Sequence, residues 1–334
     1  MEQAPYPWQK HRWWQLLDVW RQGRLPHALL LEGTEGSAIR EFAWAFSTVL
    51  LCAHSAVADQ SCGSCKSCVL VKAGTHPDLH MITSGAPGKA IKVDQIRELD
   101  NMAALKAHSG SAKCVIFEPA EAMNLNASNS LLKTLEEPAA DTFLFLVCYR
   151  PSLLAITLRS RCLRVDMRAS APTALAWLEQ QVGQRRQLRS LLALTNKGPL
   201  KVLEMVKKSG LKQWTDVFED LEGVMLRQKD PVAVAEQWNK QEPNQIFFCL
   251  EKWLQLMIRT KLSDMLPSWM DSDQRQRLLR VAKSRQEVDL FDAYHQAVSA
   301  HRLINGSTNV NAQPLLEGFL VLISQLAGGV DVYG

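Results

Sequence analysis

The sequence predicts an α/β domain on a parallel sheet, with an inserted metal-binding module, followed by a small helical lid and an all-α C-terminal domain. Three observations predict this fold class. Short apolar runs at 27–31, 114–117 and 143–148 are typical of strands buried on both faces of a parallel sheet. Four cysteines gather between residues 52 and 68. From about residue 169 such runs cease and helical periodicity takes over.

Length and composition fit a multidomain globular chain. A chain of 334 residues exceeds one ordinary hydrophobic core, so two or three domains are expected. The net charge of +4 permits a nucleic-acid partner but does not argue for one, because Lys and Arg are spread along the chain. We expect no membrane span, since no apolar run approaches about 18 residues. Met1–Lys10 lacks the apolar core of a signal peptide, so we expect a cytoplasmic chain with its eight cysteines reduced.

Periodicity places the predicted elements in order. Helices are expected at 13–20, 42–51, 93–106 and 128–137, the last ended by Pro138, and at 173–180, 187–194 and 201–207, with longer amphipathic helices after Gly210. A short strand is expected at Met81-Ile82, a loop at 84–89, and a break at Ser109-Gly110. Two apolar stripes, 246–258 and 315–323, predict the core of the C-terminal domain.

A glycine-containing loop follows the first strand and precedes a helix, which is the context of a phosphate-binding loop. Gly33 and Gly36 are present, but a working loop ends Gly-Lys-Ser/Thr, and those three positions hold Ala38, Ile39 and Arg40. Isoleucine neutralises no phosphate, and arginine does not replace the hydroxyl that binds Mg²⁺. Arg40 could still meet an anion at the helix N-terminus. The loop therefore predicts the architecture of a nucleotide site without its chemistry; from the loop alone, an unrelated turn is the alternative.

The cysteine spacing predicts a metal site. Cys62, Cys65 and Cys68 are separated by two residues each, and Cys52 lies ten residues upstream of Cys62. Four thiolates suit a closed, structural Zn²⁺ site. An iron–sulfur cluster is the alternative, but its usual fourth cysteine lies downstream and before a proline, whereas Cys68 is followed by Val69. His54 and His76 are possible substitutes for Cys52, although His76 fits better in the turn 75–78.

Two ordered motifs carry a resemblance. The run Leu-Leu-Lys-Thr-Leu-Glu-Glu-Pro at 131–138, followed about twenty residues later by Ser160-Arg161-Cys162, resembles the AAA+ clamp-loader family, and within it the delta-prime group of bacterial DNA polymerase III. The resemblance covers nearly the whole chain, most strongly 27–162. It implies a RecA-like AAA+ domain at 1–168 with a zinc module at 52–68, a lid at 169–208 and a collar at 209–334 that joins five subunits. It also supports Cys52 as the fourth metal ligand.

The resemblance implies a role for Arg161. In the family, the arginine of Ser-Arg-Cys reaches across an interface to ATP held by a neighbouring subunit, so Arg161 is expected to act in trans, with Ser160 and Cys162 as its motif neighbours. The alternative is that Arg161 caps or pairs with a local group, as a lone surface arginine usually does.

The family comparison also predicts that this chain hydrolyses no ATP. A working ATPase of the family has Asp-Glu after the 114–117 strand, where this sequence has Glu118-Pro119. Cys148 and Tyr149 stand near the position of a polar sensor, and Lys201 replaces a sensor arginine; we assign Lys201 no role.

The expected function is therefore that of a non-catalytic subunit of the polymerase holoenzyme, which binds Zn²⁺ and no ATP. The expected partners are ATP-binding gamma/tau and delta subunits in a hetero-pentameric ring that loads the sliding clamp onto primed DNA during replication, with no membrane partner. A divergent active ATPase is one alternative, opposed by Ile39, Arg40 and Pro119. A zinc nucleic-acid-binding module is another, but 52–68 contains one Lys and no aromatic residue.

Overall fold

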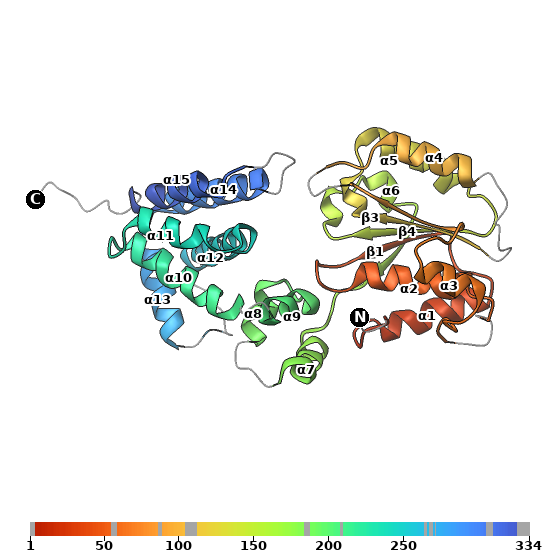
Figure 1. The fold of residues 1–334 in the computed structure, drawn as a ribbon, viewed down its shortest axis with the longest axis horizontal. Coiled ribbons are helices and arrows are strands. Elements are labelled where there is room, and N and C mark those ends of the chain that lie inside the picture. The colour runs from red at the N-terminus through yellow and green to blue at the C-terminus, as the bar shows by residue number, and fades with distance from the viewer. Residues whose placement is uncertain are drawn as a thin grey trace, which may run out of the picture. The chain divides into compact units, whose positions relative to one another are not determined.

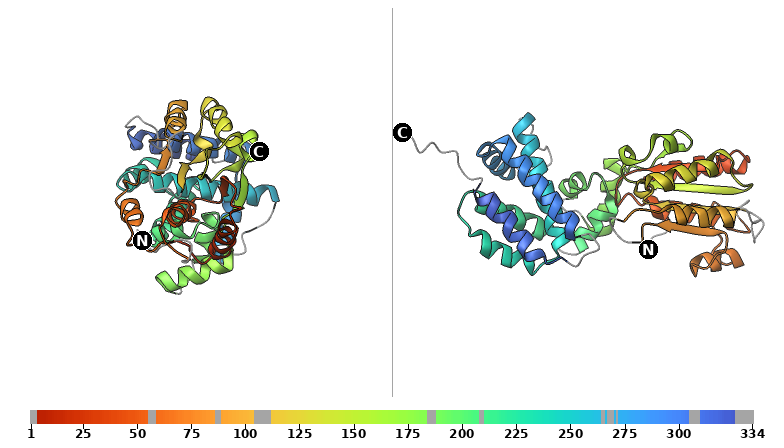
Figure 2. Two further views of the ribbon diagram at one scale, coloured as in Figure 1. Left: turned by 90° about the vertical axis from the view of Figure 1, so that its right-hand side faces the viewer. Right: turned by 90° about the horizontal axis from the view of Figure 1, so that it is seen from above.

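The computed structural model describes residues 4–54, 59–85, 89–103, 112–183, 188–207, 210–263, 266, 270, 272–304 and 310–325. The chain forms two compact units, residues 1–203 and 204–334, and each is described by itself (Figures 1 and 2). The expected division into three domains, with a lid at 169–208 and a collar at 209–334, stays a prediction. The expected helix end at Lys106, the break at Ser109-Gly110, and Pro87, Gly88, Gln187 and Ser209 lie outside the described residues.

The first unit is built on a parallel sheet of five strands in the order β2-β3-β4-β1-β5. The strands are β1 (Ala28–Glu32), β2 (Leu79–Thr83), β3 (Lys113–Glu118), β4 (Thr142–Cys148) and β5 (Leu163–Asp166). Leu30 of β1 is paired with Leu146 of β4 on one side and with Arg164 of β5 on the other. The four predicted strands are present, β5 was not predicted, and the expected fold class is confirmed.

Helices cover both faces of this sheet (Figure 1). One face carries α1 (Lys10–Arg21), α2 (Ile39–Leu51) and α3 (Lys66–Lys72), and the other carries α4 (Val93–Ala103), α5 (Leu125–Glu136) and α6 (Ile156–Arg159). Because successive side chains of a strand point to opposite faces, Leu29 and Leu31 enter the core under α2, whereas Leu30 enters the core under α5. The sheet therefore has an apolar core on each face, as the uniformly apolar strands indicate.

Short helices complete the first unit, and the last of them crosses its end at residue 203. The 3₁₀ turns at Ala120–Ala122 and Pro151–Leu153 follow β3 and β4, and α7 (Ala171–Val182), α8 (Leu188–Leu194) and α9 (Pro199–Lys207) follow β5. The predicted helices at 173–180, 187–194 and 201–207 correspond to α7, α8 and α9.

The second unit is entirely helical in its described part (Figure 2). Its helices are α10 (Gly210–Met225), α11 (Pro231–Asn239), α12 (Pro243–Ser263), α13 (Ser272–Lys283), α14 (Glu287–Ile304) and α15 (Ala312–Gln325). Phe247, Leu254 and Leu320 are fully buried, so the two predicted apolar stripes do supply the core of this unit.

Aromatic side chains form the centre of the second unit. The indole of Trp253 stacks on Trp214 with ring centroids 4.2 Å apart, and on Phe218 at 3.9 Å. Buried Asp220 accepts hydrogen bonds from the indole N–H of Trp238 at 2.9 Å and from Nζ of Lys229 at 2.6 Å. Among the described residues of the chain, no helix is both long and apolar enough to cross a membrane.

Candidate functional site

The four predicted cysteines lie together where α2 ends and α3 begins. Cys52 is the C-cap residue of α2, Cys62 lies in the following loop, Cys65 is the N-cap residue of α3, and Cys68 lies in the first turn of α3. The sulfur atoms of Cys52 and Cys65 are 4.0 Å apart, and those of Cys62 and Cys68 are 3.9 Å apart. Four sulfurs about 2.3 Å from a tetrahedral Zn²⁺ would be about 3.8 Å apart, so the thiol donors fit this ion.

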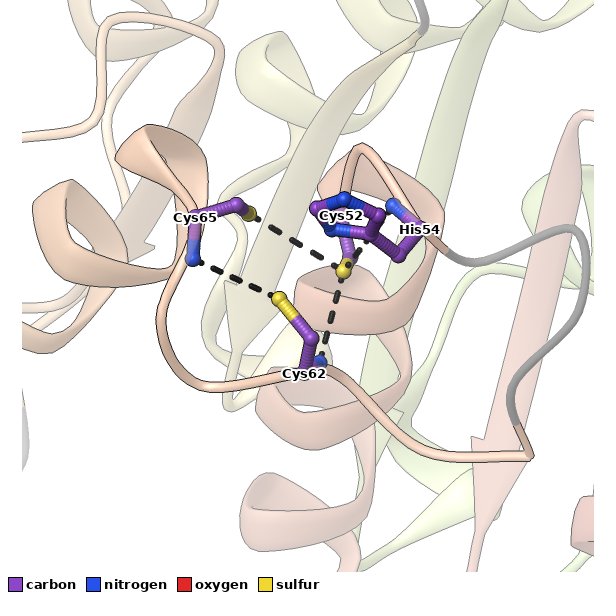
Figure 3. A group of neighbouring side chains, drawn as sticks. All are labelled: Cys52, His54, Cys62 and Cys65. Atoms are coloured by element: carbon purple, nitrogen blue, oxygen red, sulfur yellow. Dashed lines mark hydrogen bonds between the residues drawn. The ribbon is translucent and has the colours of Figure 1, made fainter.

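His54 also reaches the group. Figure 3 shows the side chains of Cys52, His54, Cys62 and Cys65 pointing toward one another, and their ligand atoms all lie within 4.8 Å of each other. The chain thus offers five donors for the four positions of a structural zinc site. His76 is engaged elsewhere, because its Nε2 contacts the Ser67 hydroxyl at 2.7 Å and its Nδ1 accepts the Asp78 backbone N–H at 3.0 Å. These residues can hold a metal ion.

Backbone amides support the sulfurs. The N–H of Cys62 donates to Sγ of Cys52 at 3.4 Å, that of Cys65 to Sγ of Cys62 at 3.4 Å, and that of Cys68 to Sγ of Cys65 at 3.5 Å. Backbone N–H groups of Ser64 and Cys65 lower the pKa of Cys62 to about 5, because they stabilise its thiolate. Burial raises the pKa of Cys68 to about 12. A bound cation would therefore displace a proton from this cluster.

The glycine-containing loop connects β1 to α2, but its chemistry differs from that of a phosphate site. Ile39, at the lysine position, is 1% exposed and packs into the core with Phe42. Its Cδ1 lies 2.8 Å from where a Cβ on Gly33 would be, so the side chain folds back against the loop. A side chain buried in this way cannot extend toward a phosphate group.

Protein groups contact the backbone of this loop from two sides. From the N-terminal segment, the Gln9 amide donates to the carbonyl oxygens of Ser37 and Ala38 at 3.0 and 2.7 Å. From the first turn of α9, the N–H of Leu200 donates to the Gly36 carbonyl at 2.9 Å. A Cβ added at Gly198 would lie 2.1 Å from the Glu35 carbonyl oxygen, so only glycine permits this approach. Lys201, to which we assigned no role, pairs with Glu35 at 3.2 Å.

The carboxylate at the end of β3 is bound by the chain's own side chains. One Glu118 oxygen accepts the Tyr149 hydroxyl at 2.6 Å, and the other lies 3.3 Å from Nε of Arg40. Burial raises the pKa of Tyr149, so this residue stays a donor. Glu118, Tyr149 and Arg40 stand where the family comparison expected a metal-binding carboxylate, a sensor and a metal-binding hydroxyl. Here Arg40 and Tyr149 both contact the Glu118 carboxylate.

Arg161 lies two residues beyond α6, on the segment that leads to β5. Its side chain is 38% exposed. Its Nε donates to Oε1 of Glu136 at 2.9 Å, its Nη2 lies 2.6 Å from the same oxygen, and its Nη1 donates to the Thr157 carbonyl at 3.2 Å. Of its motif neighbours, Ser160 donates its hydroxyl to the Thr157 carbonyl at 3.0 Å, and burial raises the pKa of Cys162 to about 11. The pairing with Glu136 was not predicted by name, although a local ion pair was the alternative stated for Arg161.

Comparisons with known proteins agree across the chain. The model of the DNA polymerase III delta subunit family matches residues 8–171, and the model of its C-terminal region matches residues 208–325. DNA polymerase III subunit delta' of Pseudomonas aeruginosa is 32% identical over 97% of this chain and 98% of that protein. The corresponding subunit of Escherichia coli is 37% identical over 53% of each chain, and that of Haemophilus influenzae is 30% identical over 71% of this chain and 72% of that one.

Solved structures are more distant. A DNA polymerase III gamma subunit-related protein of Thermotoga maritima aligns with a TM-score of 0.43 and 16% identity, covering 93% of this chain and 99% of that one, a likeness too weak to support any inference. The relative from Pseudomonas aeruginosa, which exceeds 30% identity over almost its whole length, decides the family. The chain belongs to the family of DNA polymerase III delta-prime subunits.

Proposed function

We propose that this chain is a non-catalytic subunit of an ATP-driven clamp-loader ring. In this proposal its partners are the ATP-binding gamma/tau subunits and the delta subunit, and the ring of five loads the sliding clamp onto primed DNA. The chain binds no ATP itself, and it supplies Arg161 to ATP held by a neighbouring subunit.

One observation supports the proposal that this subunit hydrolyses no ATP: the side chain at the lysine position of the loop lies in the hydrophobic core. Ile39 is 1% exposed, so regaining a phosphate contact there would require more than a change of charge. The pairing of Glu118 with Arg40 and Tyr149 supports the same conclusion, because both carboxylate oxygens already have protein partners. A bound Mg²⁺ would compete with these contacts for the carboxylate.

The surroundings of Arg161 support a role at an interface. The guanidinium is partly exposed at the edge of the sheet, and the same segment exposes large apolar side chains, with Ile156 77% and Leu153 63% accessible. Exposed apolar groups beside a charged group are common where a partner binds. A guanidinium suits contact with phosphate because it stays charged and donates through a planar fork.

We further propose that Cys52, Cys62, Cys65 and Cys68 hold one structural Zn²⁺. Cys68 is favoured over His54 because its sulfur is buried and 3.9 Å from that of Cys62, whereas His54 is exposed. The ion would fix the connection between α2 and α3, and a site closed by four thiolates offers no position for a reacting water. In this proposal residues 169–208 form the lid and 209–334 the collar.

Two measurements test the proposed function. Calorimetry of the isolated chain should show no ATP binding, and a micromolar Kd would contradict the proposal. In the reconstituted complex, Arg161→Ala should assemble normally but slow DNA-dependent ATP hydrolysis and clamp loading. The loss should be smaller than the 10³–10⁵-fold of a sole arginine finger, because other subunits keep their own arginines. Arg161→Lys should recover only part of the rate, since it lacks the planar fork. If Arg161→Ala complexes load clamps at the wild-type rate, Arg161 is a structural residue.

A further inference from the structure

We propose that Glu136 is a positioning residue for Arg161, holding its guanidinium so that the outer N–H groups face the ATP of a neighbouring subunit. This inference rests on the proposed function of Arg161. Glu136 is 25 positions before Arg161 in the sequence. It ends α5, and β4 and α6 lie between the two residues.

The contacts fix one edge of the guanidinium. A single oxygen of Glu136, Oε1, accepts a hydrogen bond from Nε at 2.9 Å and lies 2.6 Å from Nη2 as an ion pair. The carbonyl of Thr157, one turn of α6 earlier, accepts from Nη1 at 3.2 Å. The two acceptors come from different elements, so the arginine head is held from two directions.

Counting donors shows what remains for a ligand. A guanidinium has five N–H groups, and hydrogen bonds to described residues use two of them, one on Nε and one on Nη1. Nη1 therefore keeps one N–H, and Nη2, which contacts Glu136 as an ion pair, keeps its own. N–H groups on both terminal nitrogens can donate to phosphate oxygens. The ion pair with Glu136 thus leaves the phosphate-binding end available instead of covering it.

The position of Glu136 is unfavourable for the helix that carries it. Glu136 is the last residue of α5, where the negative end of the helix dipole disfavours a carboxylate. Its side chain is 55% exposed, so it is not needed to fill a core. The contact with Arg161 is the one described interaction that makes a carboxylate favourable here.

Glu137 offers a matched control. It is the next residue, is exposed, and carries the same carboxyl group, but the described contacts link Arg161 to Glu136. Substitution of either glutamate by glutamine removes one negative charge from the same end of α5. A difference between the two variants therefore reports the contact with Arg161 and not the net charge of the surface.

The experiment uses the reconstituted complex with primed DNA and measures ATP turnover against ATP concentration. Glu136→Ala should lower kcat by about two- to fivefold, the value of one partly exposed ion pair, with KM nearly unchanged. Glu136→Gln should lose less, because its amide oxygen still accepts from the guanidinium, and Glu137→Gln should match wild type. In an Arg161→Ala background, Glu136→Ala should have no further effect, and in every variant the unfolding midpoint and complex assembly should be unchanged.

Three outcomes would overturn the inference. A faster complex with Glu136→Ala would mean that the glutamate restrains Arg161 and does not position it. Equal rates for the Glu136 and Glu137 variants would mean that only surface charge matters. A full loss that persists in the Arg161→Ala background would mean that Glu136 acts through another group. Failure of the proposed function looks different, because then Arg161→Ala alone would leave turnover unchanged.

Discussion

Restoring a lysine in the glycine-containing loop should destabilise the first unit instead of creating an ATP site. The change is Ile39→Lys. Ile39 is 1% exposed, and burying an isoleucine side chain contributes about 1.5–3 kcal/mol that a lysine stem recovers only in part. An ammonium group placed in the same core adds a desolvation penalty, so we expect a total loss of about 3–5 kcal/mol in the free energy of unfolding.

Ile39→Met is the matched control, because methionine has a similar length and no charge. A volume-conserving apolar change of this kind should cost less than about 1.5 kcal/mol. The assay is hydrogen exchange of the α2 amides, which reports the opening free energy of the element that carries residue 39. Burial lowers the pKa of the new lysine below its ordinary value of about 10.4, so the unfolded chain binds more protons than the folded one. The penalty should therefore shrink as pH rises toward that value.

The reasoning would be refuted if Ile39→Lys matched Ile39→Met within about 1 kcal/mol, since the lysine would then have found a polar environment. A micromolar Kd for ATP in the combined variant Ala38→Gly, Ile39→Lys, Arg40→Thr would refute it more directly. That result would mean that the pairing of Glu118 with Tyr149 yields readily to a nucleotide.

Two further predictions concern the metal cluster and the second unit. Replacing any one of Cys52, Cys62, Cys65 and Cys68 by Ser should lower the bound zinc below one per chain and destabilise the α2–α3 connection. The variant His54→Ala should keep one zinc per chain. If metal analysis instead finds zinc kept in Cys68→Ser and lost in His54→Ala, the histidine is the fourth ligand. Asp220→Ala should lower the free energy of unfolding of the second unit by about 2–4 kcal/mol, because the buried indole N–H of Trp238 loses its acceptor. Replacement of the exposed Glu236 by Ala should change that free energy by less than about 0.5 kcal/mol, and urea unfolding measures both. Equal effects of the two variants would show that the Asp220 contacts contribute little.

Sequence patterns were sufficient where a local rule decides the structure. Three of the four predicted strands, β1, β3 and β4, were recognised because each is a short run of apolar residues buried on both faces. The fifth strand, β5, was missed because only Val165 of its four residues is buried. An edge strand of this kind has too little apolar patterning to be recognised from the sequence. The helix α3 was not predicted, because its seven residues begin in the cysteine motif and are too few to show periodicity.

The candidate sites were predictable as residues and not as contacts. The spacing of the cysteines indicated the cluster, since ligands close in sequence are brought together by one turn and one helix start. The sequence also showed directly that the glycine-containing loop has no lysine at the position of a phosphate-binding lysine. By contrast, Glu118 meets Arg40 and Tyr149 only because β3, β4 and α2 are neighbours in the fold. The contact of Glu136 with Arg161 likewise depends on α5 packing against α6, which no short-range pattern encodes.

The stacked indoles of Trp214 and Trp253 give the second unit an optical signal. Two indoles with ring centroids 4.2 Å apart and planes 20° apart couple their electronic transitions, which produces a paired band in the ultraviolet circular dichroism spectrum. The first unit holds an indole pair of different geometry, Trp8 and Trp177, with ring centroids 5.4 Å apart and planes 84° apart. The part of the spectrum that a Trp214→Phe variant lacks would therefore report the unfolding of the helical unit separately from that of the sheet. Difference spectra of this kind could then assign the damage from a substitution to one half of the chain.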